Sequence, residues 1–187
     1  MKTLKILGIC GSLRRASRNL TLLRYAQAHA PEGVEIEIAD LSALPFYNAD
    51  ISEKPAAVHS LLTQMAAADA LLFACPEYNY SIAPALKNAL DWASREPDNH
   101  CLAGKPAAMM GAGGGMGTSR AQYHLRQVCV FLDLHVLNKP EVFANAFSAS
   151  FDADGNLVDT KLQSLIVQQL EALQAHAQKL SQNGTPA

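Results

Sequence analysis

The sequence of 187 residues has the length of one ordinary domain, and its composition, 49% hydrophobic and 17% charged, supplies ample material for a buried core. The 15 Lys and Arg against 17 Asp and Glu give a formal net charge of −2, so bulk electrostatics favours neither nucleic acid nor an anionic membrane as a partner. No apolar run approaches the roughly 20 residues that span a bilayer, and Met1–Lys5 leads directly into a strand pattern instead of a signal peptide.

The first half of the chain alternates two expected strands with two expected helices. Leu4–Cys10 is an apolar run that predicts a buried strand, and Asn19–Ala30 follows with apolar side chains at helical spacing. Val34–Ala39 alternates with period two, as a half-exposed edge strand does. A second helix is predicted over Pro55–Ala68, where the proline suits the first helical turn.

The second half begins with Ala70–Cys75, which is apolar on both faces and ends before a proline. This pattern predicts a central parallel strand covered by helices on both sides. The further elements are a helix over Pro84–Ser94, a strand over Pro106–Met110, a helix over Ser119–Leu132, a strand over His135–Val142 that is interrupted or bent near Pro140, and a helix from about Asp159.

Five strands that alternate with five helices predict an α/β fold, a doubly wound five-stranded parallel sheet with helices on both faces. No repeat or linker divides the chain, so residues 1–187 are expected to form a single domain. In such sheets ligands bind beyond the carboxyl ends of the strands, where the strand order reverses. Three segments of unusual composition leave predicted strand ends and should meet there: Gly11–Asn19, Pro76–Ser81 and Gly111–Ser119.

The segment Gly11–Asn19 has the composition of a phosphate-binding loop. Three arginines within five residues supply charge, hydroxyl and amide side chains supply donors, and the following helix offers its N-terminal N–H groups. The alternative is that Ser17 or Asn19 only caps the helix and the arginines are solvated. Neither the GxxxxGK[ST] nor the GxGxxG pattern is present, which favours a phosphate monoester, such as that of FMN, over a nucleoside triphosphate or a pyrophosphate.

Two further segments offer walls for a planar ring. Pro76–Ser81 carries two tyrosines beside an amide and a carboxylate on a loop that its proline holds extended, and together they make a flat amphipathic surface. Gly111–Gly117 has five glycines in seven residues, so a ring could approach its backbone closely. Each segment alone has a simpler interpretation, an ordinary surface loop for the first and a hinge or turn for the second.

Taken together, the three segments resemble the NADPH-dependent FMN reductase family, which includes quinone and chromate reductases of flavodoxin-like fold. The matching stretches are Gly11–Asn19, Pro76–Ser81 with Lys87–Trp92, and Gly113–Ser119, of which the run from Pro76 to Trp92 is the most specific. The stretches Cys101–Lys105 and Ala144–Asp154 match no motif, and substrate preference would be set in such loops.

The resemblance implies an enzyme that passes hydride from NADPH or NADH through the N5 atom of FMN to a quinone, chromate, an azo compound or free flavin. The flavin carries this chemistry, so no catalytic side chain and no metal are expected. The cofactor-binding residues that it implies are Gly11, Ser12, Leu13, Arg14, Ser17, Arg18, Asn19 and Leu20 in the first segment, Pro76, Glu77, Tyr78, Asn79 and Tyr80 in the second, and Gly113, Gly114, Gly115 and Ser119 in the third.

Two other function classes stay open at this point. A flavodoxin-type electron carrier would bind FMN without turning over NAD(P)H, although a net charge of −2 gives weak support for an acidic docking surface. A Rossmann-like binding protein could hold a ribose with Asp40, but the missing GxGxxG counts against it. Arg120 and His124 follow the glycine segment and are minor candidates to face a substrate.

The cysteines and one tryptophan bear on compartment and assembly. Cys10, Cys75, Cys101 and Cys129 stand singly, with no pair or histidine at the spacing usual for zinc, so they are interpreted as buried hydrophobes in a reducing cytoplasm. The helix Pro84–Ser94 has a broad apolar band that includes Trp92, which predicts a homodimer or homotetramer with this helix in the interface. The alternative is that Trp92 packs inside its own subunit.

Overall fold

The computed structural model describes residues 3–183, and its centre is a parallel sheet. Its strands run in the order β2 (Val34–Ile38), β1 (Leu4–Cys10), β3 (Ala70–Ala74) and β6 (Pro106–Gly113). Two short strands, β7 (His135–Val136) and β8 (Val142–Asn145), both pair with β6 and together fill the fifth position. The direction of winding reverses between β1 and β3, as the predicted doubly wound fold requires.

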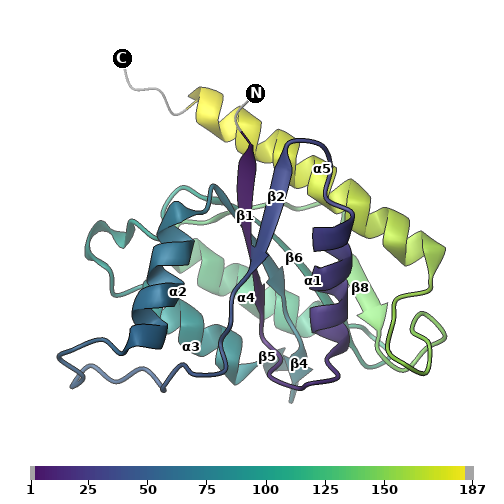
Figure 1. Cartoon of the computed structure of the whole chain (residues 1–187), viewed down its shortest axis with the longest axis horizontal. Helices are drawn as coiled ribbons and strands as arrows, with labels where there is room; N and C mark the ends of the chain where they lie inside the picture. The colour runs from purple at the N-terminus through teal and green to yellow at the C-terminus, as the bar shows by residue number, and fades with distance from the viewer. Residues whose placement is uncertain (1–2, 184–187) are drawn as a thin grey trace.

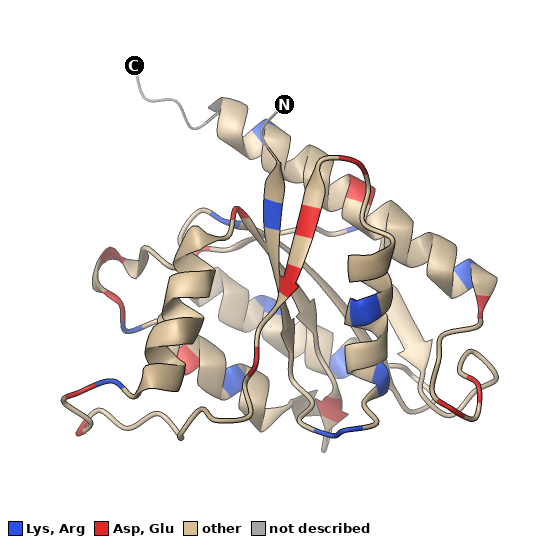
Figure 2. Cartoon of the chain, viewed as in Figure 1, with Lys and Arg blue, Asp and Glu red and all other residues tan. Residues whose placement is uncertain are grey.

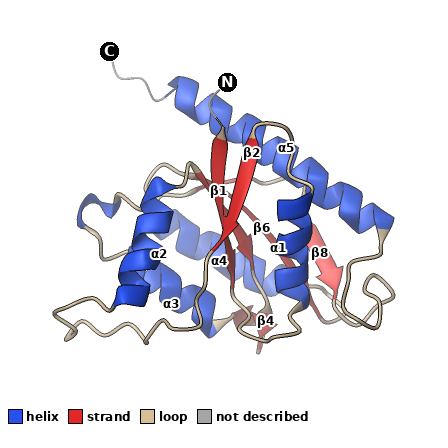
Figure 3. Cartoon of the chain, in the orientation of Figure 1, coloured by secondary structure: helices blue, strands red, loops and turns tan. Residues whose placement is uncertain are grey.

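Helices cover both faces of the sheet (Figures 1 and 3). One core holds side chains from β1 and β3 together with those of α2 (Ala56–Ala67), α3 (Pro84–Ala93) and α4 (Ser119–Phe131). The other core holds α1 (Arg18–Ala28) and α5 (Thr160–Asn183). The pleat of β3 explains its apolar sequence, because Phe73 enters the first core and Leu72 the second.

The predicted helices and the first three strands lie within one or two residues of the observed ones. The fourth strand is longer than predicted, because β6 continues through Gly111 and Ala112 to Gly113. The expected interruption of the last strand is present: β7 and β8 are separated by a segment that contains the cis Lys139–Pro140 bond. A small antiparallel pair, β4 (Glu77–Tyr78) and β5 (Ser81–Ile82), was not predicted.

Trp92 does not serve as an interface anchor, and that prediction is wrong. Its side chain is only 2% exposed, its Nε1 donates to the carbonyl oxygen of Pro45 at 2.9 Å, and its ring meets that of Tyr47 edge to face. The alternative interpretation, packing within its own chain, is correct. The prediction that the four cysteines are buried and free is confirmed. Within residues 3–183 no helix combines the length and the apolar character that a membrane crossing needs.

Candidate flavin site

The three segments that were expected to converge leave adjacent strands, β1, β3 and β6, at their carboxyl ends. Gly11 follows β1 and lies against the second segment so closely that a Cβ there would stand 2.8 Å from Cδ of Pro76. The first and third segments are joined through Asn19, whose side chain bonds the backbone of Ala112. The structure therefore brings all three to one edge of the sheet.

The loop between β1 and α1 presents unpaired donors. No backbone N–H group of residues 15–19 has a hydrogen-bond acceptor within the described part of the chain. Ser12 is half-buried, its Oγ accepting from the Arg14 N–H at 3.4 Å, while Leu13, Arg14 and Arg15 are exposed. Figure 2 shows this loop as a basic stretch. A row of free N–H groups at a helix N-terminus, next to cationic side chains, is an anion-binding arrangement.

Three of the expected cofactor residues in this segment use their side chains to hold the fold. Ser17 is the N-cap of α1, and its Oγ accepts from the Leu20 N–H at 3.2 Å. Asn19 is 5% exposed and its amide is fully engaged by Ala112. The side chain of Leu20 packs against the α1–α5 core. The capping alternative is thus observed for Ser17, while the N–H groups around it stay open.

The Arg18 side chain contacts the loop at residues 151–157. Its guanidinium lies 5.3 Å from the centre of the Phe151 ring, and Nη2 donates to the carbonyl oxygen of Asp152 at 3.4 Å. Gly155 completes this contact, since a Cβ there would stand 1.8 Å from Nη1 of Arg18. Arg18 therefore fastens the 151–157 loop to the start of α1.

The second segment is a tight hairpin and not the extended loop expected from its proline. Asn79 and Tyr80 both have positive φ, 50° and 67°, which is the geometry of a two-residue type I′ turn between β4 and β5. Pro76 is buried at the base, and the Tyr78 and Tyr80 side chains are 42% and 66% exposed. The exposed tyrosines leave an aromatic surface at the edge where the other two loops end.

Glu77 ties this hairpin to α4. Its carboxylate forms an ion pair with Arg120, accepts from Arg120 Nε at 2.6 Å and accepts from the Ala121 N–H at 3.3 Å. The Arg120 guanidinium also lies 3.7 Å from the centre of the Tyr80 ring. The Glu77 carboxylate, and to a lesser extent the Tyr80 phenol group, raise the pKa of Arg120. Sequence reasoning gave Arg120 little weight, because a partner 43 residues away leaves no local pattern.

The glycines of the third segment do two different things. Gly111 and Gly113 are needed for packing, since a Cβ would stand 2.1 Å from Thr118 Oγ1 at the first and 2.2 Å from the Gly117 carbonyl oxygen at the second. At Gly114 and Gly115 a Cβ would meet nothing within 4 Å. Ser119 follows as the first residue of α4 and is half-buried. The open backbone expected for a ring is therefore confined to Gly114 and Gly115.

Two other candidates lie elsewhere. Asp40 follows β2 and accepts from the Ser42 N–H at 2.8 Å, and that bond, with the Ser42 hydroxyl, lowers its pKa within an exposed turn. His124 faces Ser81, with Nδ1 3.0 Å from the serine Oγ. Ser81 and His124 line a cavity of about 600 Å³ between α3 and α4, together with Ile82, Lys87, Leu90, Asp91, Ser94, Arg95, Gln127, Val128, Phe131 and Leu132.

The strand order β2-β1-β3-β6, followed by β7 and β8, with a switch point between β1 and β3, is that of the flavodoxin-like class of proteins. The chain belongs to the NADPH-dependent FMN reductase family, whose model matches residues 4–149. The predicted family, fold and cofactors, FMN with NAD(P)H, are confirmed.

Relatives of this chain are enzymes. The NAD(P)H-dependent FMN reductase of Pseudomonas aeruginosa is 54% identical over 180 residues, which cover 95% of this chain and 97% of the relative. The NAD(P)H:quinone oxidoreductase of Solanum tuberosum is 50% identical over 185 residues, with 95% and 94% covered. The solved structure of FerB, an NAD(P)H:(acceptor) oxidoreductase from Paracoccus denitrificans, superposes with a TM-score of 0.82 at 30% identity and covers 92% of this chain and 98% of that one. The enzyme interpretation is confirmed over that of an electron carrier.

Proposed function

We propose that this chain is an FMN-dependent NAD(P)H oxidoreductase whose acceptor is a quinone or a free flavin. One observation carries the proposal: two open surfaces of the chain lie at the same edge of the sheet. They are the backbone N–H groups of residues 15–19, which have no acceptor among the described residues, and the backbone of Gly114 and Gly115, where a Cβ would meet nothing within 4 Å. Both surfaces lie at the edge where an FMN needs a phosphate site and a ring site. The two are held in register by Asn19.

The phosphate of FMN would be held by the loop between β1 and α1. Its N–H groups and the N-terminus of α1 attract the dianion, and Ser12 and Arg14 add a hydroxyl and a charge. Ser17 and Asn19 act by positioning the loop, since their side chains cap α1 and bond Ala112. Arg18 holds the 151–157 loop beside it.

The isoalloxazine ring would lie between the hairpin and the glycine turn. Tyr78 and Asn79 offer one wall, and Gly114 and Gly115 let the ring approach peptide N–H groups on the other. When bound, FMN supplies hydride acceptance from NAD(P)H and two-electron donation to the oxidant. The chain's own part is to fix the ring and to direct N–H dipoles at its polar edge.

The Glu77–Arg120 pair keeps the hairpin against α4 and so holds the tyrosine wall in place. The wall is solvent-exposed at Tyr78 and Tyr80, which suits planar oxidants that stack and leave. Quinones meet that requirement, and relatives of this chain are quinone reductases. Chromate and azo compounds are further acceptors of the same exposed site. If the enzyme prefers NADPH over NADH, the exposed side chains of Arg14 and Arg15 would bind the extra phosphate of NADPH.

Self-association through the α3–α4 face is part of the proposal. α4 exposes a stripe of side chains at helical spacing, in which Tyr123 is 64%, Val130 81% and Phe131 75% exposed, and it borders the 600 Å³ cavity. A second copy of the chain is the proposed occupant, and this gives a homodimer or homotetramer. The four free cysteines support the cytoplasm as the compartment.

An absorbance spectrum of the purified protein tests the function first, because a bound flavin absorbs visible light. Chromatography of heat-released cofactor should identify FMN, and stopped-flow reduction by NADPH and by NADH should precede rapid reoxidation by a benzoquinone. Recovery of FAD, or absence of flavin after reconstitution, would overturn the cofactor assignment. Reduction by nicotinamide without quinone turnover would overturn the acceptor.

A further inference from the structure

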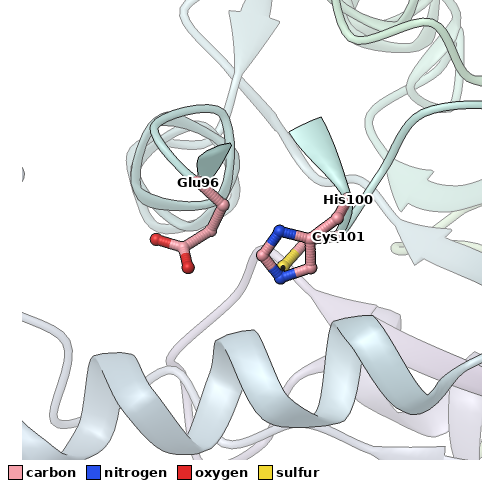
Figure 4. Close-up of side chains that lie close together, drawn as sticks. All are labelled: Glu96, His100 and Cys101. Atoms are coloured by element: carbon pink, nitrogen blue, oxygen red, sulfur yellow. Dashed lines mark hydrogen bonds between the residues drawn. The ribbon is translucent and has the colours of Figure 1, made fainter. Parts of the chain in front are cut away.

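We propose that Glu96, His100 and Cys101 form a binding site for Zn²⁺, completed by a water molecule, in the connection between α3 and β6. The ligand atoms of these three residues all lie within 4.8 Å of one another (Figure 4). Thiolate, imidazole and carboxylate are the donors that zinc combines in proteins, whereas Mg²⁺ and Ca²⁺ prefer oxygen alone.

The spacing of the two central ligands already fits one metal ion. Nε2 of His100 lies 3.5 Å from Sγ of Cys101. A tetrahedral zinc with bonds of about 2.3 Å to sulfur and about 2.0 Å to nitrogen sets these atoms about 3.5 Å apart. The third ligand is the Glu96 carboxylate, which lies within 4.8 Å of both of these atoms.

The histidine is held in the tautomer that a metal needs. Its Nδ1 lies 3.0 Å from the carbonyl oxygen of Pro97. Because a carbonyl oxygen only accepts, Nδ1 carries the hydrogen and Nε2 keeps its lone pair. Metal-bound histidines are commonly oriented by this kind of contact.

Glu96 and Cys101 lie in a largely desolvated place. Cys101 is fully buried, and the Glu96 side chain is 12% exposed. On binding, the metal ion takes the place of the thiol proton, which is released to solvent. Lys54 forms an ion pair with Oε1 of Glu96.

The backbone of this connection is unusual in a way that suits a chelating loop. A single 3₁₀ turn at Pro97–Asn99 brings Glu96 back towards His100, and both Asp98 and Asn99 have positive φ, 56° and 50°. Within residues 3–183 the Oδ1 atom of Asn99 is the buried side-chain polar atom without a hydrogen-bond partner. Backbone in this left-handed region costs free energy and is found most often at functional and ligand-binding sites.

The site is separate from the flavin site. The three residues lie beside α2, where Glu96 pairs with Lys54 and the Cys101 thiol donates to the Leu62 carbonyl oxygen, and none of them belongs to the three loops of the candidate flavin site. Because His100 is exposed, water can occupy the fourth position and the ion can exchange. The inferred effect is a clamp on the α3–β6 connection that is independent of FMN.

Zinc binding to the FMN-loaded full chain tests the proposal. Protein stripped with a chelator and kept reduced by a phosphine is titrated with Zn²⁺ against a chromophoric chelator, and bound metal is counted by mass spectrometry. The expected result is one zinc per chain. His100→Gln should weaken binding at least tenfold, because even indirect partners of a zinc ligand matter by ~10–100-fold. Co²⁺ should give a thiolate-to-cobalt absorption band that Cys101→Ala abolishes.

The matched control is His29→Gln. His29 is also exposed, and its Nδ1 also lies 3.0 Å from a carbonyl oxygen, that of Tyr25, but it stands on the opposite face of the sheet. Cys129→Ala is the control for a buried thiol. Both controls should keep stoichiometric zinc. Zinc binding that persists in His100→Gln, or no zinc in the wild type, would overturn the proposal. His100→Gln carries the test if the buried Cys101→Ala variant does not fold.

Discussion

Asn19 and Ala112 are 93 residues apart and share two hydrogen bonds. Asn19 Nδ2 donates to the Ala112 carbonyl oxygen at 2.8 Å, and the Ala112 N–H donates to Asn19 Oδ1 at 2.9 Å. One residue stands in the first turn of α1, and the other directly precedes the glycines that were assigned to the ring. A single amide therefore sets the position of the loop between β1 and α1 relative to the glycine turn.

Replacing Asn19→Ala should affect both stability and cofactor binding. The buried N–H and carbonyl groups of Ala112 would lose their partners, which should lower the free energy of unfolding by about 2–4 kcal/mol. The affinity for FMN should fall more than tenfold, because the two loops are no longer held in register. Urea unfolding of the apoprotein and fluorescence titration with FMN measure the two effects.

Asn88→Ala is the control for that variant. Asn88 is also buried, accepting from the Tyr47 N–H at 2.8 Å and donating to the Pro45 carbonyl oxygen at 2.9 Å. Its loss should destabilise the chain by a similar amount while leaving the FMN affinity unchanged. Equal losses of FMN affinity in the two variants would show that the effect of Asn19→Ala is general and not due to the contact between loops.

The glycine turn separates packing from cofactor binding in a pair of alanine variants. Gly114→Ala should leave the unfolding free energy within about 0.5 kcal/mol of wild type, since its Cβ meets nothing within 4 Å, yet it should weaken FMN binding. Gly113→Ala should destabilise the apoprotein, because its Cβ would stand 2.2 Å from the Gly117 carbonyl oxygen. Unchanged FMN affinity in Gly114→Ala would place the ring elsewhere.

Ser17 and Arg14 should act differently although both belong to the proposed phosphate-binding loop between β1 and α1. Ser17→Ala removes the N-cap of α1 and should cost about 1 kcal/mol of stability. Arg14→Ala changes an exposed side chain and should leave stability unchanged while weakening FMN by about 1.5–3 kcal/mol. Thermal unfolding of the apoproteins and FMN titration separate the two. An Arg14→Ala variant with wild-type FMN affinity would contradict the phosphate assignment.

Two buried thiols make stability depend on alkaline pH. Burial raises the pKa of Cys75 and of Cys129 from 9.0 to about 12. The unfolded chain loses these protons first, so the stability is complete below pH 9.0 and falls as the pH rises towards 12. Each thiol should contribute a slope of about 1.4 kcal/mol per pH unit in that window. Urea unfolding at several pH values should show a shallower decline in Cys75→Ala/Cys129→Ala; parallel declines would refute this origin.

Alternation of apolar strands with helical segments was enough to predict a doubly wound parallel sheet and both helical layers. The run at Ala70–Cys75 required cover on two faces, and the chain could supply that cover only as a doubly wound sheet. The convergence of the three loops followed from topology alone. The hairpin at Asn79 and Tyr80 was not predicted, because tyrosine at positive φ carries no sequence signal and proline favoured an extended loop.

Side-chain partners could not be predicted where they lie far apart in the sequence. Arg18 contacts Phe151 and Asp152, and Glu77 pairs with Arg120, so two residues assigned to the cofactor have other partners. Likewise, the motif residues Asn88 and Trp92 both bond the Pro45 carbonyl oxygen. Composition shows which residue types a loop contains, and only the tertiary structure shows which of them are already engaged.

Assembly is best tested on α4, because the side chains of α3 that looked apolar face inward. Leu90 is 1% exposed, so Leu90→Glu would unfold the chain instead of probing an interface. Phe131 is 75% exposed at the border of the α3–α4 cavity, and Phe131→Glu should shift the protein towards monomers in light scattering, since it places a charge in an apolar contact. Phe46→Glu is the control: Phe46 is 78% exposed in the loop after β2, outside that cavity, and its variant should associate as the wild type does. A wild type that scatters as a monomer would exclude self-association. An equal response of the two variants would mean that the α3–α4 face is not the interface.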